Sequence, residues 1–293
     1  MPDRKDMMNT TLRLALPKGR ITEEVIRLLA AAGVVIHSRG RSYRPRVSEP
    51  GIEVKFLKPQ NIPKLVEIGA HDCGFTGHDW VAESGADVVE VLDTGLDPVT
   101  LVAAAPEATL AGLRDLGRPL IVASEFDTLT RRYMESRRQP YLFIRTFGAT
   151  EVYPPEDADL ILDLVATGGT LRENRLAVVD EVLKSSTRFV ASRGALADAA
   201  KAERIEALKT LLTAVLEARR RVLLEMNVPS ERLAQVVEVL PAMKSPTIQE
   251  LYGGKGYAVK AAVPRAGLAQ VMLRLKQAGA SDLIAYALEK VIP

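Results

Sequence analysis

The sequence has few of the features that mark exported, disulfide-linked or membrane-spanning proteins. Its single cysteine, Cys73, cannot form an intrachain disulfide, which fits a reducing compartment. No segment approaches the roughly 18 uncharged apolar residues of a membrane-spanning helix, and the amino-terminal "MPDRKDMMNTTLRLALPKGR" lacks the apolar core of a signal peptide. We therefore expect a soluble, cytoplasmic protein that does not contact a membrane.

The chain also lacks an excess of charge of either sign. Thirty-nine basic and 37 acidic residues give a formal net charge of +2. Nucleic-acid-binding proteins and proteins of anionic membrane surfaces carry a marked basic excess, so we expect no nucleic-acid partner. An anionic ligand must then be small and bound locally. With 293 residues, 47% of them hydrophobic, the chain is long enough for two or three domains with a substantial core.

Short apolar runs alternate with helix-like stretches over the first two thirds of the chain. "ITEEVIRLLAAAG" is one such stretch, in which Thr22 is expected to cap the first amides of a helix and Gly33 to end it. The alternation predicts an α/β fold with largely parallel sheets. The expected strands span residues 12–17, 52–57, 87–92, 99–104, 119–124, 141–146 and 160–165.

The pattern changes from about Arg193. "ALADAAKAERIEALKTLLTAVLEARRR" has no proline and no internal glycine, which predicts one long connecting helix. The elements expected after it follow the order β-α-β-β-α-β, the arrangement of ferredoxin-like modules, and place a domain boundary near residue 222. The "GGKG" at 253–256 lies between two strands, which favours a hairpin turn over a phosphate-binding loop.

The stretch "DLILDLVATGGTLRENRL", residues 159–176, joins a buried-strand pattern to a loop of small and hydroxyl-bearing residues. Asp163 interrupts the strand, and the helical spacing of "LRENRLAVVDEVL" predicts a helix after the loop. Such a junction presents backbone amides and hydroxyl groups to a phosphate. The spacing matches neither the Walker loop nor the dinucleotide fingerprint. The expected phosphate cradle comprises Thr167, Gly168, Gly169 and Thr170.

A carboxylate directly before a phosphate loop suits a 5-phosphoribosyl ligand. The loop would hold the 5-phosphate while Asp163 accepts hydrogen bonds from the ribose hydroxyl groups and orients the anomeric carbon. From this stretch alone an alternative stays open, in which the loop only caps a helix and Asp163 is incidental.

The same stretch resembles the phosphoribosyl diphosphate loop of the ATP phosphoribosyltransferases, the first enzymes of histidine biosynthesis. "LRLALPKGRI", "IGAHDCGFTGHDWVAES", "DTLTRRYMES" and "GATEVYPPEDADL" resemble further segments of that family, and "LPAMKSPTIQELY" and "QAGASDLI" resemble the regulatory domain of its long form. The match covers nearly the whole chain in the family's order. A single Asp163 preceded by Leu162, in place of two adjacent acids, favours this family over the base-salvage phosphoribosyltransferases.

The resemblance implies transfer of 5-phosphoribosyl from phosphoribosyl diphosphate to N1 of ATP with release of pyrophosphate. It also implies Mg²⁺ held largely by the substrate's phosphates, with no dedicated protein-only metal site, and a histidine-inhibited homo-hexamer. The implied fold has two periplasmic-binding-protein-like lobes, residues 1–95 with 186–221 and residues 96–185, followed by a regulatory ferredoxin-like domain over 222–293.

The resemblance also implies roles for individual residues. Phosphoribosyl diphosphate is expected to contact Asp163, Ala166, Thr167, Gly168, Gly169, Thr170, Leu171, Lys18 and Arg20, the last two on its diphosphate. ATP is expected at Thr76, Gly77 and Asp79, and Glu151 near magnesium or ribose. Regulatory histidine is expected at Asn227, Ser245 and Thr247.

The chain departs from the family's usual residues at Lys58, Asn61, Ser124 and Phe126. Two other functions stay open: a phosphoribosyltransferase with another acceptor, and a non-catalytic, two-lobed ligand-binding regulatory subunit. A small domain that serves oligomerisation alone is the alternative to histidine binding. A zinc site at His71, Cys73 and His78 is disfavoured because a closed site needs a fourth ligand.

Overall fold

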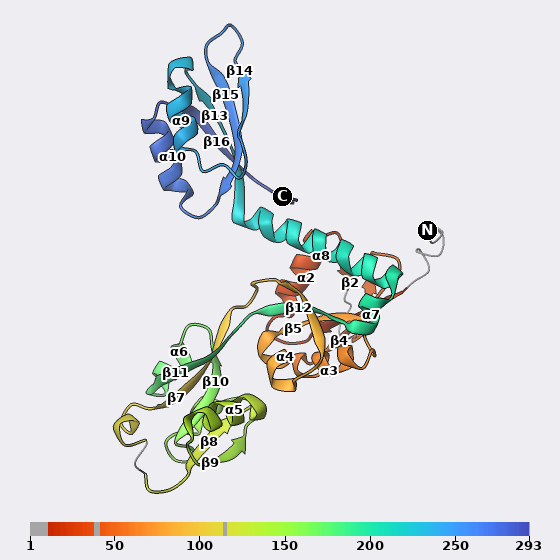
Figure 1. Cartoon of the computed structure of the whole chain (residues 1–293), viewed down its shortest axis with the longest axis vertical. Coiled ribbons are helices and arrows are strands. Elements are labelled where there is room, and N and C mark those ends of the chain that lie inside the picture. The colour runs from red at the N-terminus through yellow and green to blue at the C-terminus, as the bar shows by residue number, and fades with distance from the viewer. Residues whose placement is uncertain (1–10, 38–41, 114–115, 293) are drawn as a thin grey trace. The chain divides into compact units, whose positions relative to one another are not determined.

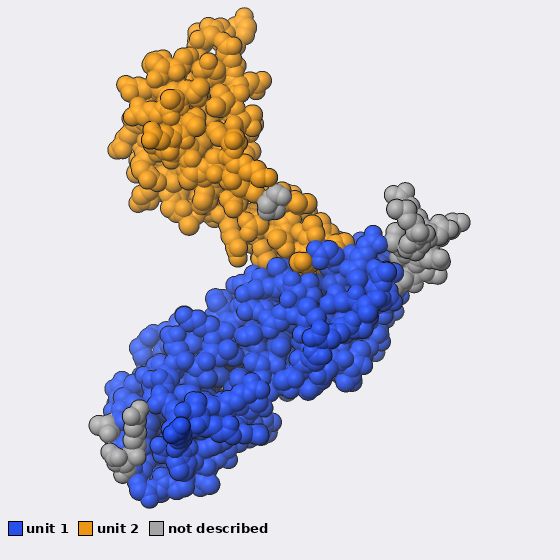
Figure 2. All heavy atoms as spheres, viewed as in Figure 1, with its two compact units in different colours: residues 1–27, 34–206 blue, residues 28–33, 207–293 orange. Residues whose placement is uncertain are grey.

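The computed structural model describes residues 11–37, 42–113 and 116–292. Residues 1–10, on which the expectation of no export signal partly rests, lie outside the described residues. The chain divides into two compact units, drawn in Figures 1 and 2: Met1–Arg27 with Val34–Glu206, and Leu28–Gly33 with Ala207–Pro293. No helix in the described part of the chain is long and apolar enough to cross a membrane.

The first unit contains two five-stranded sheets, and the first of them has the order β4-β1-β5-β12-β6. The strand β1 pairs in parallel with β4 and β5, whereas β12 pairs antiparallel with β5 and β6. Buried Ile62 and Val66 of α3 pack on Ala15 and Val190 of the sheet. The elements are β1 Leu12–Pro17, α2 Thr22–Ala31, β4 Ile52–Leu57, α3 Ile62–Glu67, β5 Cys73–Gly77, α4 His78–Ser84, β6 Val88–Asp93 and β12 Thr187–Ser192.

The second sheet has the order β11-β7-β10-β8-β9. Here β10 and β9 lie parallel to β8, but β10 and β11 run antiparallel to β7. The expectation of largely parallel sheets is therefore wrong in part. The chain passes between the sheets from β6 to β7 and from β11 to β12, and β7 and β12 are antiparallel to their neighbours. The elements are β7 Val99–Pro106, β8 Leu120–Ser124, α5 Asp127–Arg137, β9 Tyr141–Arg145, β10 Leu160–Val165, α6 Gly169–Glu173 and β11 Leu176–Ser185.

The helix expected after the phosphate loop is mostly a strand. Helix α6 ends at Glu173, Arg175 has a φ of 54°, and β11 pairs with β7 from Leu176 onward. Irregularities between Val178 and Asp180 and between Glu181 and Leu183 each place an extra residue in β11. Each bulge shifts the inward-facing side chains by one position, so a bulged strand imitates the spacing of a helix.

The expected cap of α2 is also different in the structure. The Thr22 hydroxyl accepts a hydrogen bond from the Gly19 amide at 2.7 Å and lies 2.9 Å from the Pro17 carbonyl oxygen. Thr22 is thus the first residue of α2 and closes the turn before the helix instead of capping its amides. Gly33 ends the helical segment as expected, with a φ of 102° and its amide bonded to Ala30.

The single connecting helix expected after Arg193 is two helices, α7 Arg193–Ala197 and α8 Ala199–Arg220. Asp198 between them is extended, and its carboxylate accepts hydrogen bonds from the amides of Ala200 and Lys201 at 3.0 and 3.2 Å. An aspartate in this role starts a new helix, which is why α8 begins where it does.

The second unit contains the expected βαββαβ module, with sheet order β14-β15-β13-β16. One face of β13 is buried through Val222, Leu224, Met226 and Val228, which pack with residues of both helices. The "GGKG" segment forms the expected turn, closed by the Leu251 amide bonded to the Gly256 carbonyl at 2.8 Å. The elements are β13 Arg221–Val228, α9 Leu233–Val239, β14 Thr247–Glu250, β15 Tyr257–Pro264, α10 Leu268–Gln277 and β16 Ser281–Ala287.

Short elements complete the chain, and the domain limits proposed from the sequence stay predictions. The expected limit near residue 222 coincides with the start of β13, whereas the compact units divide after Glu206 within α8. The short elements are β2 Ile36–His37, β3 Arg46–Val47, and the 3₁₀ turns Pro59–Asn61, Leu110–Gly112, Thr150–Val152 and Ser230–Arg232.

Gly256 should be the least replaceable glycine of the "GGKG" turn. Its φ is 122°, and a Cβ there would overlap the Val228 carbonyl oxygen, whereas Gly254 has room for one. We expect Gly256→Ala to lower the free energy of unfolding of the second unit by about 2–4 kcal/mol, and Gly254→Ala by about 1 kcal/mol. Denaturant unfolding measures both. Equal losses would contradict the steric argument.

Candidate active site

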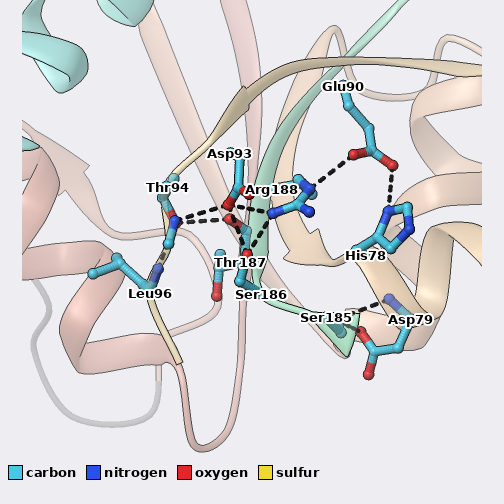
Figure 3. Close-up of polar contacts among 11 residues, drawn as sticks. His78, Asp79, Glu90, Asp93, Thr94, Leu96, Ser185, Ser186, Thr187 and Arg188 are labelled. Atoms are coloured by element: carbon cyan, nitrogen blue, oxygen red, sulfur yellow. Dashed lines mark hydrogen bonds and ion pairs between the residues drawn. The ribbon is translucent and has the colours of Figure 1, made fainter. Parts of the chain in front are cut away.

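The two sheets of the first unit are joined by two chain crossings that are hydrogen-bonded to each other (Figure 3). The Thr94 hydroxyl and amide both donate to the Thr187 carbonyl oxygen, at 2.7 and 3.1 Å, and the Thr187 amide donates to the Leu96 carbonyl oxygen at 2.9 Å. Thr94 and Thr187 are 2% exposed. The crossings therefore form a short, buried ladder between segments some 90 residues apart in sequence.

Charged side chains support this ladder on one side. Arg188 forms ion pairs with Asp93 and with Glu90, the latter at 2.8 Å, and His78 Nδ1 lies 2.7 Å from the other Glu90 oxygen. The Ser186 hydroxyl donates to Asp93 at 2.6 Å. The ion pairs are only partly shielded from water, so they orient the crossing segments more than they stabilise the fold.

A cavity of about 290 Å³ opens beside the crossings, at the carboxyl ends of the strands of the first sheet. Parallel α/β sheets bind ligands at this edge. A second cavity, of about 390 Å³, shares four of its lining residues, so the two are adjacent. The shared residues are Lys58, Gln60, Trp80 and Glu125.

Lys18 and Arg20 follow β1 directly and line the first cavity, as the "PKGR" segment predicts. The Lys18 ammonium lies 4.0 Å from the centre of the Tyr43 ring, and their hydrogen bond and the lysine charge lower the pKa of Tyr43. Arg20 is 2.9 Å from Asp97, which has a φ of 48°. Both cations are exposed, so an anion in the cavity can reach them.

Gly77 and Asp79 line the same cavity, but Thr76 does not. The Asp79 carboxylate is 3% exposed and accepts a hydrogen bond from the Ser185 hydroxyl at 3.0 Å. Burial raises the pKa of Asp79. A Cβ at position 77 would overlap this carboxylate, so only glycine fits there. Thr76 is fully buried and donates to the Pro59 carbonyl oxygen at 3.0 Å, which fixes the turn that carries Gln60.

Three carboxylates interact where the second sheet approaches the cavity. Burial, together with the negative charges of Glu151 and Glu125, raises the pKa of Asp163 to about 6. A hydrogen bond from the Leu164 amide partly opposes this shift. Burial likewise raises the pKa of Glu125, although Lys58 and Arg145 oppose the shift. Without a bound cation these carboxylates repel one another.

Hard oxygen ligands of this kind suit Mg²⁺, which keeps several waters and usually binds through one or two carboxylates and substrate phosphates. No group of three or more His, Cys, Asp or Glu side chains in the described ranges is arranged to hold a metal ion. The donor set therefore fits Mg²⁺ brought in by a phosphate-bearing ligand and shared with Asp163 or Glu151.

The expected phosphate cradle begins two residues beyond β10. Gly168 has a φ of 74°, and Ala166, Thr167 and Thr170 are exposed. Gly169 opens α6. These residues do not line either cavity, although Leu164, next to Asp163, does. The Leu171 side chain is 3% exposed and packs into the core of the second sheet, so only its backbone can face a ligand.

The structure adds cavity residues that sequence patterns did not single out as binding residues. Gln60 Oε1 is buried without a hydrogen-bond partner, which leaves an acceptor for a ligand. Trp80 stacks on Phe126 at 4.6 Å between ring centres and forms part of the wall. Glu125 and Arg145 complete this side. The signal for Gln60 was its place directly after a strand end, in "FLKPQNIP".

In the second unit, the three residues expected to bind histidine lie on or beside the sheet, and the histidine site stays a prediction. Asn227 lies in β13 and donates to Asp282 at 2.9 Å. Ser245 and Thr247 are exposed, and Thr247 is the first residue of β14.

Replacing Asp163 by asparagine should stabilise the ligand-free protein at neutral pH. The pKa of about 6 lies above the unfolded value, so the folded state binds the proton more tightly and loses stability as pH rises from 4 to 7. Asparagine carries no such loss. We expect the gain of Asp163→Asn over wild type to grow across this range by on the order of 1–3 kcal/mol.

Thermal unfolding at pH 4 and pH 7.5 measures this difference. Asp157→Asn, which removes an exposed carboxylate of the same segment, is the control and should change little at either pH. A lower melting temperature for Asp163→Asn at pH 7.5 would show that the buried charge is not destabilising.

Comparison with known proteins identifies the family. The ATP phosphoribosyltransferase profile matches residues 58–214, and that of the HisG carboxy-terminal domain matches residues 218–290. ATP phosphoribosyltransferases of Desulforudis audaxviator and Thermodesulfovibrio yellowstonii are 40% and 38% identical to the chain, over 96% and 98% of it and 99% and 100% of their own length.

A solved structure gives the same result for the fold. The ATP phosphoribosyl transferase (HisG:HisZ) complex from Thermotoga maritima includes a chain that matches 69% of this one and 99% of its own length, with a TM-score of 0.60 and 27% identity. The chain therefore belongs to the ATP phosphoribosyltransferase family, in the long form that carries the carboxy-terminal domain.

Proposed function

We propose that this protein transfers the 5-phosphoribosyl group of phosphoribosyl diphosphate to N1 of ATP, releasing pyrophosphate, in the first step of histidine biosynthesis. One observation carries the proposal beyond family membership: the cavity at the strand ends is lined by Lys18 and Arg20 and also by Leu164 of β10. Asp163 precedes Leu164 in this strand, and the glycine-threonine loop follows the strand. Such a site separates a place for a diphosphate from a place for a phosphorylated sugar.

The chemistry asked of these residues is electrostatic. As the bond to pyrophosphate breaks, the sugar becomes oxocarbenium-like and the leaving group gains negative charge, which Lys18 and Arg20 neutralise. Asp163 accepts hydrogen bonds from the ribose hydroxyl groups and fixes the anomeric carbon opposite the acceptor. Bound Mg²⁺ adds positive charge on the diphosphate. ATP N1 attacks through a lone pair, so no general base is required.

Gln60 is proposed to orient the acceptor. An adenine ring offers N–H groups on its exocyclic amine next to N1, and the unpartnered Gln60 Oε1 in the cavity wall is an acceptor for them. Asp79 and Gly77 are proposed to lie on the same side of the ligand. This assignment favours ATP over acceptors that lack an amine beside the attacking nitrogen.

Regulation is proposed to reside in the ferredoxin-like module. Histidine would inhibit by binding the active and inhibited states with different affinity, since equal affinity shifts no equilibrium. Asn227, Ser245 and Thr247 are the residues proposed for histidine, in a site between subunits of a hexamer; Ser245 and Thr247 are exposed. A cytoplasmic location completes the proposal.

The proposed reaction should be seen directly by mass spectrometry. Purified protein mixed with ATP, phosphoribosyl diphosphate, Mg²⁺ and a pyrophosphatase is expected to form phosphoribosyl-ATP, and added L-histidine should lower the yield. Product with GTP or inosine triphosphate but not with ATP would move the assignment to another acceptor. A folded protein that binds phosphoribosyl diphosphate and forms no product would contradict the proposal.

Lys18→Gln and Arg20→Gln should each lower kcat/KM for phosphoribosyl diphosphate by about 10- to 100-fold, because each removes a charge from the diphosphate in the transition state. The control is Arg27→Gln, which removes an exposed arginine from α2 and leaves the cavity unchanged. Steady-state kinetics with the three variants tests the assignment. Kinetics of the Lys18 and Arg20 variants equal to those of the Arg27 variant would refute it.

A further inference from the structure

We propose that the first unit has a second anion site, separate from the catalytic cavity, that binds a small phosphate-bearing anion. The site is a cavity of about 300 Å³ that shares no lining residue with the two cavities beside the crossings. It is lined mainly by Arg13, Arg44, Glu53, Lys55, Leu65 and His71. The proposal does not depend on the identity of the catalysed reaction.

The register of the first sheet builds the floor of this cavity. Arg13 of β1 pairs with Glu53 of β4, and Lys55 lies two residues further along the same strand, on the same face. The end of α3 forms the wall, where the His71 amide donates to the Leu65 carbonyl oxygen at 3.1 Å. The cavity thus lies toward the start of β1, whereas the catalytic cations follow its end.

Cations outnumber carboxylates in the lining, and two of them have no counter-ion. Arg44 and Lys55 form no ion pair with any described residue, and Glu53 is the lining carboxylate. Arg13 donates hydrogen bonds from Nε and Nη2 to Asp72 and to the Gly69 carbonyl oxygen, at 2.8–3.2 Å. Its Nη1 remains able to donate to another acceptor. Unneutralised cations around a concavity attract and retain small anions.

The second, independent observation is a buried polar atom without a partner. His71 Nδ1 is inaccessible to water and makes no hydrogen bond. Buried polar atoms in folded proteins nearly always have a partner, and His71 lines the cavity, so a small rotation of its ring would let this nitrogen bind a ligand there. Burial lowers the pKa of His71, and the charges of Lys55, Arg13 and Arg44 lower it further, whereas the charge of Asp72 raises it.

These groups together fit a phosphate. A neutral imidazole can donate one hydrogen bond, the arginines donate in a fixed fork, and the lysine adds a point charge, while a phosphate offers several acceptor oxygens. The volume suits inorganic phosphate or the phosphate end of a nucleotide. Arg44 directly follows Tyr43, whose ring contacts Lys18, so an occupied site would fix the segment that contacts a catalytic cation.

The chain has three histidines, His37, His71 and His78, which makes a histidine-labelled NMR titration readable. The full-length protein, labelled at the imidazole rings and assigned with His71→Gln, is titrated with inorganic phosphate at constant ionic strength. We expect the His71 resonances to shift saturably at millimolar phosphate while His37 stays unchanged. Parallel titrations with AMP and ribose 5-phosphate distinguish phosphate alone from a larger ligand.

Lys55→Gln and Arg44→Gln should each weaken the His71 response at least about fivefold. The matched control is Lys64→Gln, a lysine of α3 that is paired with Glu67 and lies outside the cavity. Its response should equal that of the wild type. Thermal melting checks that the variants fold.

A His71 resonance that does not move, or that moves equally in the Lys55 and Lys64 variants, overturns the proposal. Failure here and failure of the proposed catalysis are distinguishable. Lys55→Gln should keep the yield of phosphoribosyl-ATP near the wild-type level, and a saturable His71 shift would stand even if no product formed.

Discussion

The buried ladder between the two crossing segments is the constraint on which the rest of the first unit depends. Thr94, Leu96 and Thr187 exchange hydrogen bonds where the chain passes between the sheets, in both directions. Because hydrogen bonds hold both crossings at the same place, the strand ends of the first sheet and β10 of the second approach one cavity. Asp79 and Ser185, which line this cavity, are also hydrogen-bonded to each other.

The charges at and beside the cavity oppose the stability of the fold. Asp163, Glu151 and Glu125 repel one another, and burial makes the Asp163 charge unfavourable. Lys18 and Arg20 are held exposed by Tyr43 and Asp97. In the proposed reaction, the magnesium ion would face the carboxylates and the substrate's phosphates would face the two cations. Binding of the substrate would then relieve the repulsion among the carboxylates.

The second cationic cavity, at the other end of β1, also contains charges that the described residues do not compensate. Asp72 pairs with both Arg13 and Lys201 inside the unit, whereas Arg44 and Lys55 form no ion pair, and His71 Nδ1 no hydrogen bond, with the described residues. Cations therefore lie near both ends of β1, with Lys18 and Arg20 beyond its carboxyl end and Arg44 and Lys55 toward its start. The first pair is assigned to the proposed reaction, and the second pair is not.

The sequence by itself determined the local elements and the family. Apolar runs marked β1, β4 and β6 to β10 closely but missed β5, because its "CGFTG" is short and rich in glycine. The element order gave the ferredoxin-like module, and "PKGR" and "ATGGT" located the cavity's cations and the loop after Asp163. Only the tertiary structure decided the strand character of β11, because its bulges imitate helical spacing. It also placed Gln60, Glu125 and His71 at cavities, since burial, unpaired atoms and cavities arise from contacts between distant segments that periodicity does not encode.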